Sequence, residues 1–211
     1  MYGMSFSIPN LLTESHAGTE QRSAARYISL IRAAKLITGA GEFVCVVRDV
    51  SQTGVKVKTF HRLPAGGRPM ELELQNGERF ALRLVREGVG EASFAFMQPV
   101  VIERLIREHW SYPKRQFRLR VSFPVRLLTN SGSHDAQVSN LSQQGARLTT
   151  DARFAVHQLV RIEAKDLLDV HAKVRWHHNG MCGMVFEDTF ALPQIAHLAA
   201  LIQCPALVRN V

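Results

Sequence analysis

The sequence predicts a mainly β protein of two tandem antiparallel barrels, each followed by a C-terminal α-helix. Three observations carry this prediction: short apolar segments with strand periodicity, turn signals rich in glycine between them, and an internal repeat of roughly 90 residues. A chain of 211 residues accommodates two domains of that size. Barrels are favoured over open sheets because closure removes unpaired strand edges.

The repeat is visible as landmarks that recur in the same order in the two halves. Five pairs of landmarks are separated by 89 to 92 positions, a drift that small changes in loop length absorb. The pairs are Arg26 and Arg118 (92), Asp49 and Asn140 (91), Gly54 and Gly145 (91), Val85-Arg86 and Val174-Arg175 (89), and Phe96 and Phe186 (90).

The first half begins with residues 1–19, which are polar and predict a flexible N-terminal arm. The first domain covers residues 20–112, and its opening segment, 20–32, is compatible with helix or coil. We interpret Phe43–Val47 and Val55–Lys58 as alternating runs, the period of a strand, with Asp49–Gly54 as the tight turn between them, in which the closing glycine is expected to supply a positive φ. The predicted strands are 33–36, 42–47, 55–60, 70–74, 80–85 and 92–97, and a helix is predicted over 100–110.

The second domain, residues 113–211, repeats this plan after Ser111-Tyr112-Pro113 ends the helix. Asn179-Gly180 is a hairpin signal in this half, as Asn76-Gly77 is in the first. The predicted strands are 123–128, 136–139, 146–149, 159–163, 171–176 and 182–187, and the closing helix is predicted over 193–203.

The charge balance narrows the class of partner. The chain has 26 Lys and Arg against 18 Asp and Glu, a net charge of +8 that is divided almost evenly between the halves. A modest positive potential attracts small anionic ligands. No long basic block occurs, and the few aromatic residues are not interleaved with basic ones, which disfavours DNA or RNA as the partner.

Other compositional signals indicate a cytoplasmic, non-enzymatic protein. The three cysteines lack CxxC spacing, which argues against a disulfide framework, and Cys45 lies in a strand run where a buried apolar role is expected. The N-terminus has no signal-peptide pattern and no apolar run is long enough to span a bilayer. The nine histidines have no metal-ligand spacing and no nucleophile motif is present. We therefore expect no metal, no cofactor and no catalytic residue.

The strongest functional signal is an arginine pair upstream of the first turn. Arg22 and Arg26 are four residues apart, on one side of the segment, where two guanidinium groups can grip phosphates bidentately or contact guanine edges and faces. Asp49 complements them by accepting from guanine N–H donors. Either motif alone is compatible with solvated arginines and a simple turn. Because both recur together in the second half, we predict a ligand site.

These motifs resemble the PilZ family of bacterial receptors for cyclic di-GMP, whose pattern is RxxxR followed by [D/N]xSxxG. The first half matches fully, as Arg22-Ser-Ala-Ala-Arg26 and Asp49-Val-Ser-Gln-Thr-Gly54. The resemblance implies six-stranded barrels followed by a helix, and a receptor in which the ligand orders the arginine-bearing segment and a protein effector reads the change. The cyclic di-GMP-binding residues that it implies are Arg22, Arg26, Asp49, Ser51 and Gly54.

The second half departs from the family pattern. Lys114 stands where the first arginine is expected, and lysine cannot supply a planar bidentate fork. We therefore expect weaker or absent ligand binding there, with the second barrel serving as a packing or partner-contact domain. The residues implied for a weaker second site are Lys114, Arg115, Arg118, Asn140, Ser142 and Gly145. The alternative is a nucleotide-independent scaffold with two degenerate barrels that docks a protein partner.

Overall fold

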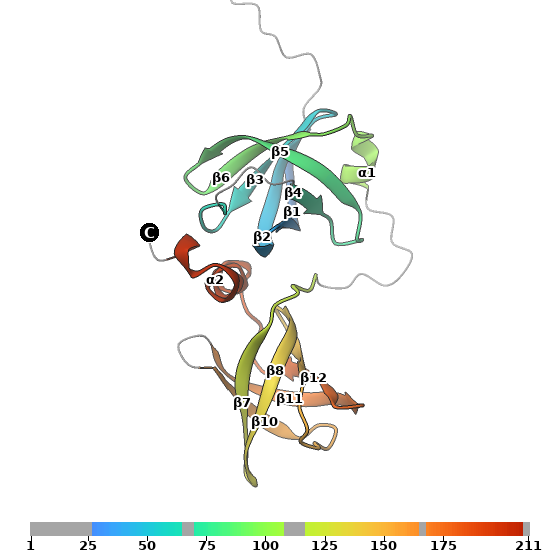
Figure 1. Cartoon of the computed structure of the whole chain (residues 1–211). Helices are drawn as coiled ribbons and strands as arrows, with labels where there is room; N and C mark the ends of the chain where they lie inside the picture. Colours follow the sequence, from blue (N-terminus) through green and yellow to red (C-terminus); the bar gives the residue numbers. More distant parts are fainter. Residues whose placement is uncertain (1–26, 65–69, 108–116, 165–167, 209–211) are drawn as a thin grey trace, which may run out of the picture.

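The computed structural model describes residues 27–64, 70–107, 117–164 and 168–208. It confirms the predicted fold class, with two closed six-stranded antiparallel barrels and helix α2 lying between them (Figure 1). The first barrel comprises β1 (Tyr27–Thr38), β2 (Gly41–Val50), β3 (Gly54–Thr59), β4 (Met70–Glu73), β5 (Arg79–Gly88) and β6 (Glu91–Phe96), followed by α1 (Ile102–Ile106). The second comprises β7 (Phe123–Thr129), β8 (Gly132–Ser142), β9 (Gly145–Thr149), β10 (Leu159–Ala164), β11 (Leu168–His178) and β12 (Met181–Phe186), followed by α2 (Leu192–Gln203) and a 3-10 turn, η1 (Pro205–Leu207).

The two barrels share one strand order and the same irregularities. The first runs β1-β2-β3-β6-β5-β4 around its wall, and the second runs β7-β8-β9-β12-β11-β10. Bulges interrupt the pairing at equivalent places, after Val47 and Val138 and again after Leu84 and Val174. The second pair of bulges aligns the two halves at a separation of 90. Our matching of Val85-Arg86 with Val174-Arg175, at 89, was therefore wrong by one residue.

The opening strand and the first helix also differ from the prediction. Strand β1 begins at Tyr27, so residues 27–32 are strand and not helix or coil, with Tyr27, Ile28 and Arg32 paired to β2 across an irregularity, while residues 20–26 of the segment lie outside the described residues. Helix α1 has five residues, Ile102–Ile106, where the sequence predicted a helix over 100–110, and residues 108–110 of that prediction lie outside the described residues. Val101 is extended before it, and the Arg32 guanidinium donates to the carbonyl oxygens of Leu105 and Ile106 at 2.7 and 2.9 Å. These bonds satisfy the carbonyl groups at the end of the helix.

Strand β2 is buried on both faces. Its run Phe43–Val47 is uninterrupted apolar sequence, and our interpretation of it as alternating was wrong. Cys45 packs in the first barrel's core, as predicted for this residue, whereas Val44 packs with the core cluster of the second barrel. Phe43 lies against Ala200 and Leu207, which belong to α2 and η1. The outer face of β2 is thus the first barrel's contact with the second.

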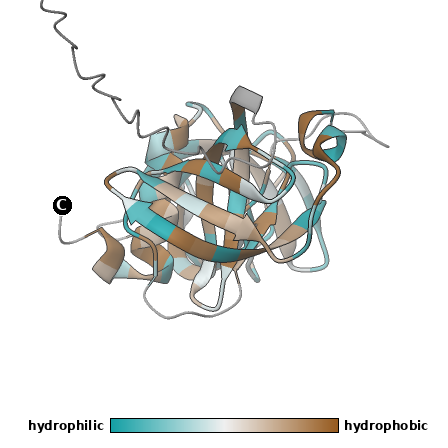
Figure 2. Cartoon of the chain, turned by 90° about the horizontal axis from the view of Figure 1, so that it is seen from above, coloured by the Kyte–Doolittle hydropathy of each residue, from teal (hydrophilic) through white to brown (hydrophobic). Residues whose placement is uncertain are grey.

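The other strands show the ordinary pattern, in which inward residues are apolar and outward residues are polar. Along β7, for example, Phe123, Val125 and Leu127 are buried and the residues between them are exposed. Figure 2 shows this alternation of hydrophobic and hydrophilic residues along the strands. Within the described ranges, no helix combines the length and the apolar character that crossing a bilayer requires.

Candidate functional site

The Asp49–Gly54 motif bridges the end of β2 and the start of β3. Asp49 lies in β2, after the bulge, opposite Lys56 in β3, and it is partly exposed. Ser51 is buried, and its hydroxyl accepts from the backbone N–H of Gly54 at 3.0 Å while its own N–H donates to the Gly54 carbonyl at 2.8 Å. The Ser142 hydroxyl donates to the Gly145 carbonyl at 3.1 Å across the equivalent turn. Both serine hydroxyls therefore stabilise their turns through hydrogen bonds to the glycine backbone, which is a structural role that needs no ligand.

Gly54 and Gly145 are required for close packing, and our explanation through a positive φ was wrong. Neither residue is among the glycines with positive φ. A Cβ atom on Gly54 would lie 2.8 Å from the carbonyl oxygen of Phe94, and one on Gly145 would lie 2.1 Å from that of Met184. The neighbouring strand of each barrel passes too close for any side chain at this position.

Backbone pairing brings the end of the arginine motif beside the turn in the first barrel. Tyr27 pairs with Val50, and Ile28 pairs with Asp49. Arg22 and Arg26 lie outside the described residues, and Arg26 is the direct chain neighbour of Tyr27. The chain that follows the motif is therefore anchored next to the turn that the prediction assigns to the same ligand.

The second barrel repeats this arrangement. Leu119 and Leu141 form an isolated antiparallel bridge, with N–H to carbonyl distances of 2.8 and 3.0 Å. Arg118 precedes this bridge and is exposed, and Ser142 follows it. Lys114 and Arg115 lie outside the described residues. Asn140 is partly exposed in β8 and pairs with Arg147 of β9, as Asp49 pairs with Lys56.

A cavity of about 600 Å³ lies at this second turn. Its walls include Arg118, Ser142 and Gly145, three residues that were predicted from sequence, together with Arg175 and Trp176 from β11. The size is within the range of small-molecule sites. The structure thus brings the two parts of the second motif to one cavity, where a cation, backbone groups and an aromatic face are available.

Trp176 and Arg175 were not predicted from the sequence. Trp176 lies opposite Gly183 across the bulge, and a Cβ atom on Gly183 would lie 2.1 Å from the Trp176 Nε1. The absence of a side chain at Gly183 therefore allows the indole to lie against β12. The signal in the sequence was that Trp176 directly follows the repeat landmark Val174-Arg175. The sequence did not indicate the face on which the indole lies, because that depends on the bulge.

Strand pairing in the second barrel places four residues in one row across the wall: Asn140, Arg147, Gly183 and Trp176. The corresponding row of the first barrel carries different side chains. Pairing across β2, β3, β6 and β5 aligns Asp49, Lys56, Ser93 and Arg86, so that Arg86 stands where Trp176 stands in the second barrel. Lys56 forms an ion pair with Glu91 at 2.7 Å. The first site therefore offers a guanidinium at the position where the second offers an indole.

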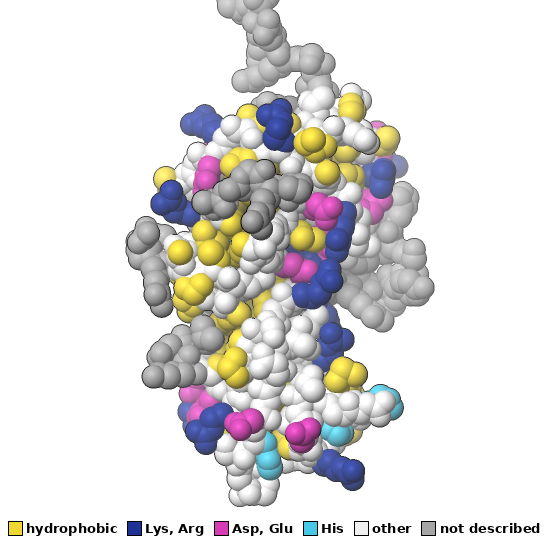
Figure 3. All heavy atoms as spheres, in the orientation of Figure 1, with side chains coloured by type: hydrophobic (Ala, Val, Ile, Leu, Met, Phe, Trp, Pro, Cys, Tyr) yellow, Lys and Arg dark blue, Asp and Glu magenta, His cyan; other side chains and the backbone are white. Residues whose placement is uncertain are grey.

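Two of the cysteines lie buried in the barrel cores. Burial raises the pKa of Cys45 far above its usual range and raises the pKa of Cys182 to about 11, so neither thiol is an activated nucleophile. Among the described residues no group of three His, Cys, Asp or Glu side chains could hold a metal ion. On the face shown in Figure 3, basic and acidic side chains are interspersed over both barrels.

Comparison with known proteins gives similarities to a family and to solved structures. The model of the PilZ domain matches residues 113–204, which is the half with the incomplete arginine motif. No match was found among curated proteins. The similar solved structures include the Borreliella burgdorferi PlzA protein in complex with c-di-GMP (10% identity, 82% of this chain and 87% of that chain, TM-score 0.34). Bacillus subtilis MotI/DgrA, an inhibitor of motility, is 14% identical over 87% of this chain and 100% of that chain, with a TM-score of 0.36.

A third similar structure is the Escherichia coli YcgR protein in complex with c-di-GMP, which is 9% identical over 78% of this chain and 80% of that chain, with a TM-score of 0.34. The PilZ domain model matches the barrel whose cavity is lined by Arg118, Ser142 and Gly145. The chain therefore carries a PilZ domain in residues 113–204, preceded by a barrel with the same strand order.

Proposed function

We propose that this chain is a non-enzymatic receptor for cyclic di-GMP. The observation that carries the proposal is the convergence of Arg118, Ser142 and Gly145 on one cavity, since these residues come from the two separated parts of the second motif. A dinucleotide offers phosphates and guanine faces, which match a guanidinium and an indole. The match of residues 113–204 to the PilZ domain supports this ligand, because the family that the chain resembles consists of cyclic di-GMP receptors, although Lys114 departs from its pattern.

We assign the main site to the first barrel because its motif is complete. Arg22 and Arg26 bind phosphates and guanine, and Asp49 accepts from the guanine N–H donors. Arg86 of β5, in the same row as Asp49, adds a contact with the ligand that the motif alone does not reveal. Ordering of the arginine-bearing segment by the ligand is the signal that a protein effector reads.

The second barrel binds the same ligand more weakly. Arg118 and Trp176 line the cavity, but Lys114 replaces one bidentate arginine. We expect Trp176 to report occupancy of this site, because guanine contact quenches or shifts indole emission. The chain has two tryptophans, so a Trp110→Phe background makes Trp176 the sole reporter.

Calorimetric titration of the full chain with cyclic di-GMP tests the proposal. Arg26→Ala and Asp49→Ala are expected to weaken the tighter phase, and Arg118→Ala the weaker phase followed by Trp176. A lost charged hydrogen bond corresponds to roughly 10- to 150-fold in affinity. Arg153→Ala is the matched control, because Arg153 is exposed, carries the same charge and does not line the cavity.

Each outcome has a defined meaning. A Lys114→Arg variant with tighter binding in the Trp176 phase supports the assigned cause of the weaker second site. Affinity that is unchanged in Arg26→Ala, Asp49→Ala and Arg118→Ala refutes the site assignment. No heat and no thermal shift at saturating cyclic di-GMP refutes the receptor function and leaves the scaffold alternative.

A further inference from the structure

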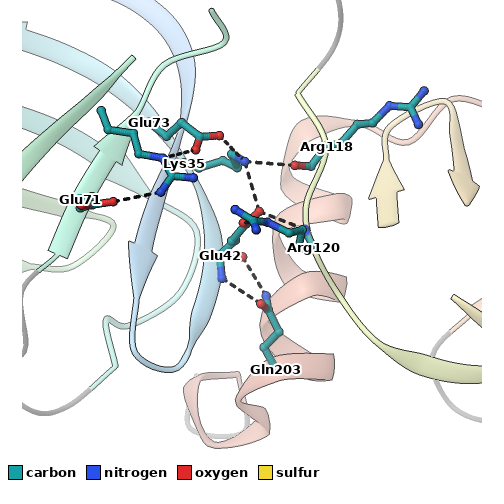
Figure 4. Close-up of polar contacts among 8 residues, drawn as sticks. Lys35, Glu42, Glu71, Glu73, Arg118, Arg120 and Gln203 are labelled. Atoms are coloured by element: carbon teal, nitrogen blue, oxygen red, sulfur yellow. Dashed lines mark hydrogen bonds and ion pairs between the residues drawn. The ribbon is translucent and has the colours of Figure 1, made fainter. Parts of the chain in front are cut away.

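A buried charged cluster joins the two barrels beside the second site. Lys35 of β1 and Glu42 of β2 are each 6% exposed and form an ion pair at 3.2 Å, and Lys35 also pairs with Glu73 of β4. Charges at this depth persist only when they are paired and hydrogen-bonded. Glu73 also pairs with Arg79 of β5, whereas the remaining partners of Lys35 and Glu42 come from the second domain (Figure 4).

Those partners belong to the segment that contains Arg118. The Lys35 Nζ donates to the main-chain carbonyl of Arg118 at 3.2 Å, and the Glu42 carboxylate accepts from the Arg120 N–H at 3.0 Å and from its Nε at 2.9 Å. The Arg118 side chain points away from the cluster (Figure 4) and lines the cavity. First-barrel charges thus hold the backbone on one side, while the guanidinium faces the ligand site on the other.

We infer that Lys35 and Glu42 of the first barrel are positioning residues for the ligand site of the second barrel. They act through the backbone of residues 118–120, which they fix against Leu141 so that Arg118 is oriented before the ligand arrives. This inference rests on the proposed function for its consequence, which is ligand affinity, but the positioning itself is a property of the free protein. The second site is therefore built from both barrels, although all its lining residues belong to one.

The physical basis is preorganisation. A binding segment that is already ordered does not lose conformational freedom when the ligand binds, so its affinity is higher than that of a loose segment. Within the second barrel, the Leu119–Leu141 bridge supplies one anchor. Two further anchors flank this bridge: Lys35 bonds to the backbone of Arg118, and Glu42 bonds to the backbone of Arg120.

Gln203 provides a matched control at the same interface. Its side chain accepts from the Glu42 N–H and donates to the Glu42 carbonyl, both at 2.8 Å, so it ties α2 to the same residue of the first barrel. Among the described contacts, it makes none with residues 118–120. Gln203→Ala therefore loosens the interface without releasing the Arg118 segment, whereas Glu42→Ala does both.

The first measurement is amide hydrogen exchange in the ligand-free full chain. We expect the Leu119 and Leu141 amides to exchange about tenfold faster in Glu42→Ala than in wild type, and less than about twofold faster in Gln203→Ala. Arg120→Ala keeps the buried charges and removes only one bond, from a side chain that is 69% exposed. It should raise exchange in the same direction by a smaller factor, and it serves if Glu42→Ala does not fold.

The second measurement is the affinity for cyclic di-GMP, followed by Trp176 in the Trp110→Phe background. Glu42→Ala is expected to weaken binding about fivefold or more, the lower range of coupling between sites. In an Arg118→Ala background, the effect of Glu42→Ala should disappear, because both changes act through one side chain. A merely structural role would leave the two effects additive.

The two proposals fail in different ways. Unchanged exchange at Leu119 and Leu141 in both Glu42→Ala and Arg120→Ala overturns the positioning role, whatever the ligand does. Equal exchange and equal affinity loss in Glu42→Ala and Gln203→Ala also overturn it, because general loosening then explains both. Faster exchange with no binding of cyclic di-GMP by wild type supports positioning and refutes the proposed ligand.

Discussion

Replacement of Gly145 tests whether close packing is the reason for a glycine in the turn that joins β8 and β9. The replacement Gly145→Ala puts a Cβ atom 2.1 Å from the carbonyl oxygen of Met184 and 3.2 Å from its carbonyl carbon. Both obstacles are backbone atoms of the adjacent strand, so β9 and β12 must separate to admit the methyl group. Forced overpacking of this kind costs about 1–3 kcal/mol and occasionally more. We expect Gly145→Ala near the upper end of that range.

The comparison with asparagine separates the two reasons for a glycine. Asparagine tolerates positive φ better than alanine does, but it is larger. At Gly145 we therefore expect Gly145→Asn to be at least as destabilising as Gly145→Ala. Gly77 is the control, because it has φ of +89° and a Cβ atom added there would meet no atom within 4 Å. There Gly77→Asn should be milder than Gly77→Ala.

Urea unfolding followed by Trp176 emission measures these effects, because Trp176 lies in the same barrel as Gly145. The Trp110→Phe background removes the second signal. A Gly145→Ala variant within about 0.5 kcal/mol of wild type would refute the close-packing explanation, since overpacking costs more than this. So would a Gly145→Asn variant that is clearly more stable than Gly145→Ala, because this is the result that a φ requirement gives.

Two further predictions concern the contact between the barrels. Val44→Asp places in β2 the residue that β8 has at the equivalent position, Asp135, and should lower the free energy of unfolding by several kcal/mol, because Val44 is buried. The reverse change, Asp135→Val, affects an exposed position and should alter it by less than about 0.5 kcal/mol. Equal effects of the two changes in urea unfolding would contradict this asymmetry. Burial lowers the pKa of His61, against the opposing effects of the Arg62 carbonyl and Glu87, and His197 lowers it further. Because the folded pKa lies below the unfolded value of about 6.5, the contribution is complete above that pH and is lost as the pH falls below it. His61→Gln should therefore have a flatter pH dependence of unfolding between about pH 7.5 and 5.5, and identical slopes would rule this out.

Local sequence was sufficient for the barrels because each strand is specified by its own residues. Alternation, glycine turns and the repeat predicted all twelve strands approximately in place, and the second helix within one residue. The first helix was overestimated because its end is set by Arg32, which lies about 70 residues earlier. The start of β1 was missed because it depends on pairing with β2 and not on any local apolar pattern.

The candidate site was predictable only where it coincides with a motif. Arg118, Ser142 and Gly145 were implied by the resemblance to the family motif and do line one cavity. Trp176 could not be found in this way, because a bulge in β11 decides which face it occupies. The roles of Lys35 and Glu42 were equally hidden, since their partners at Arg118 and Arg120 lie about 80 positions away.

The two repeats differ in the outer face of one strand, which is buried in β2 of the first barrel and exposed in β8 of the second. One group of ion pairs recurs with the charges rearranged. Arg79 of β5 pairs with Glu71 and Glu73 of β4 in the first barrel, whereas Arg161 of β10 pairs with Glu163 and with Asp169 of β11 in the second. Lys35 corresponds to Arg126, whose guanidinium reaches Ser133 where Lys35 reaches Glu42.

The difference between the barrels is thus concentrated on one outward row of a single strand. In β8 this row is Ser133, Asp135 and Gln137, all exposed, and in β2 it is Glu42, Val44 and Val46, all buried. Val44 supplies apolar contact with the second barrel's core, and the glutamate supplies the anchor for Arg120. Uninterrupted apolar sequence in a strand whose repeat partner alternates therefore identifies the interface, and the acidic residue that begins the row identifies where the Arg118–Arg120 segment is held.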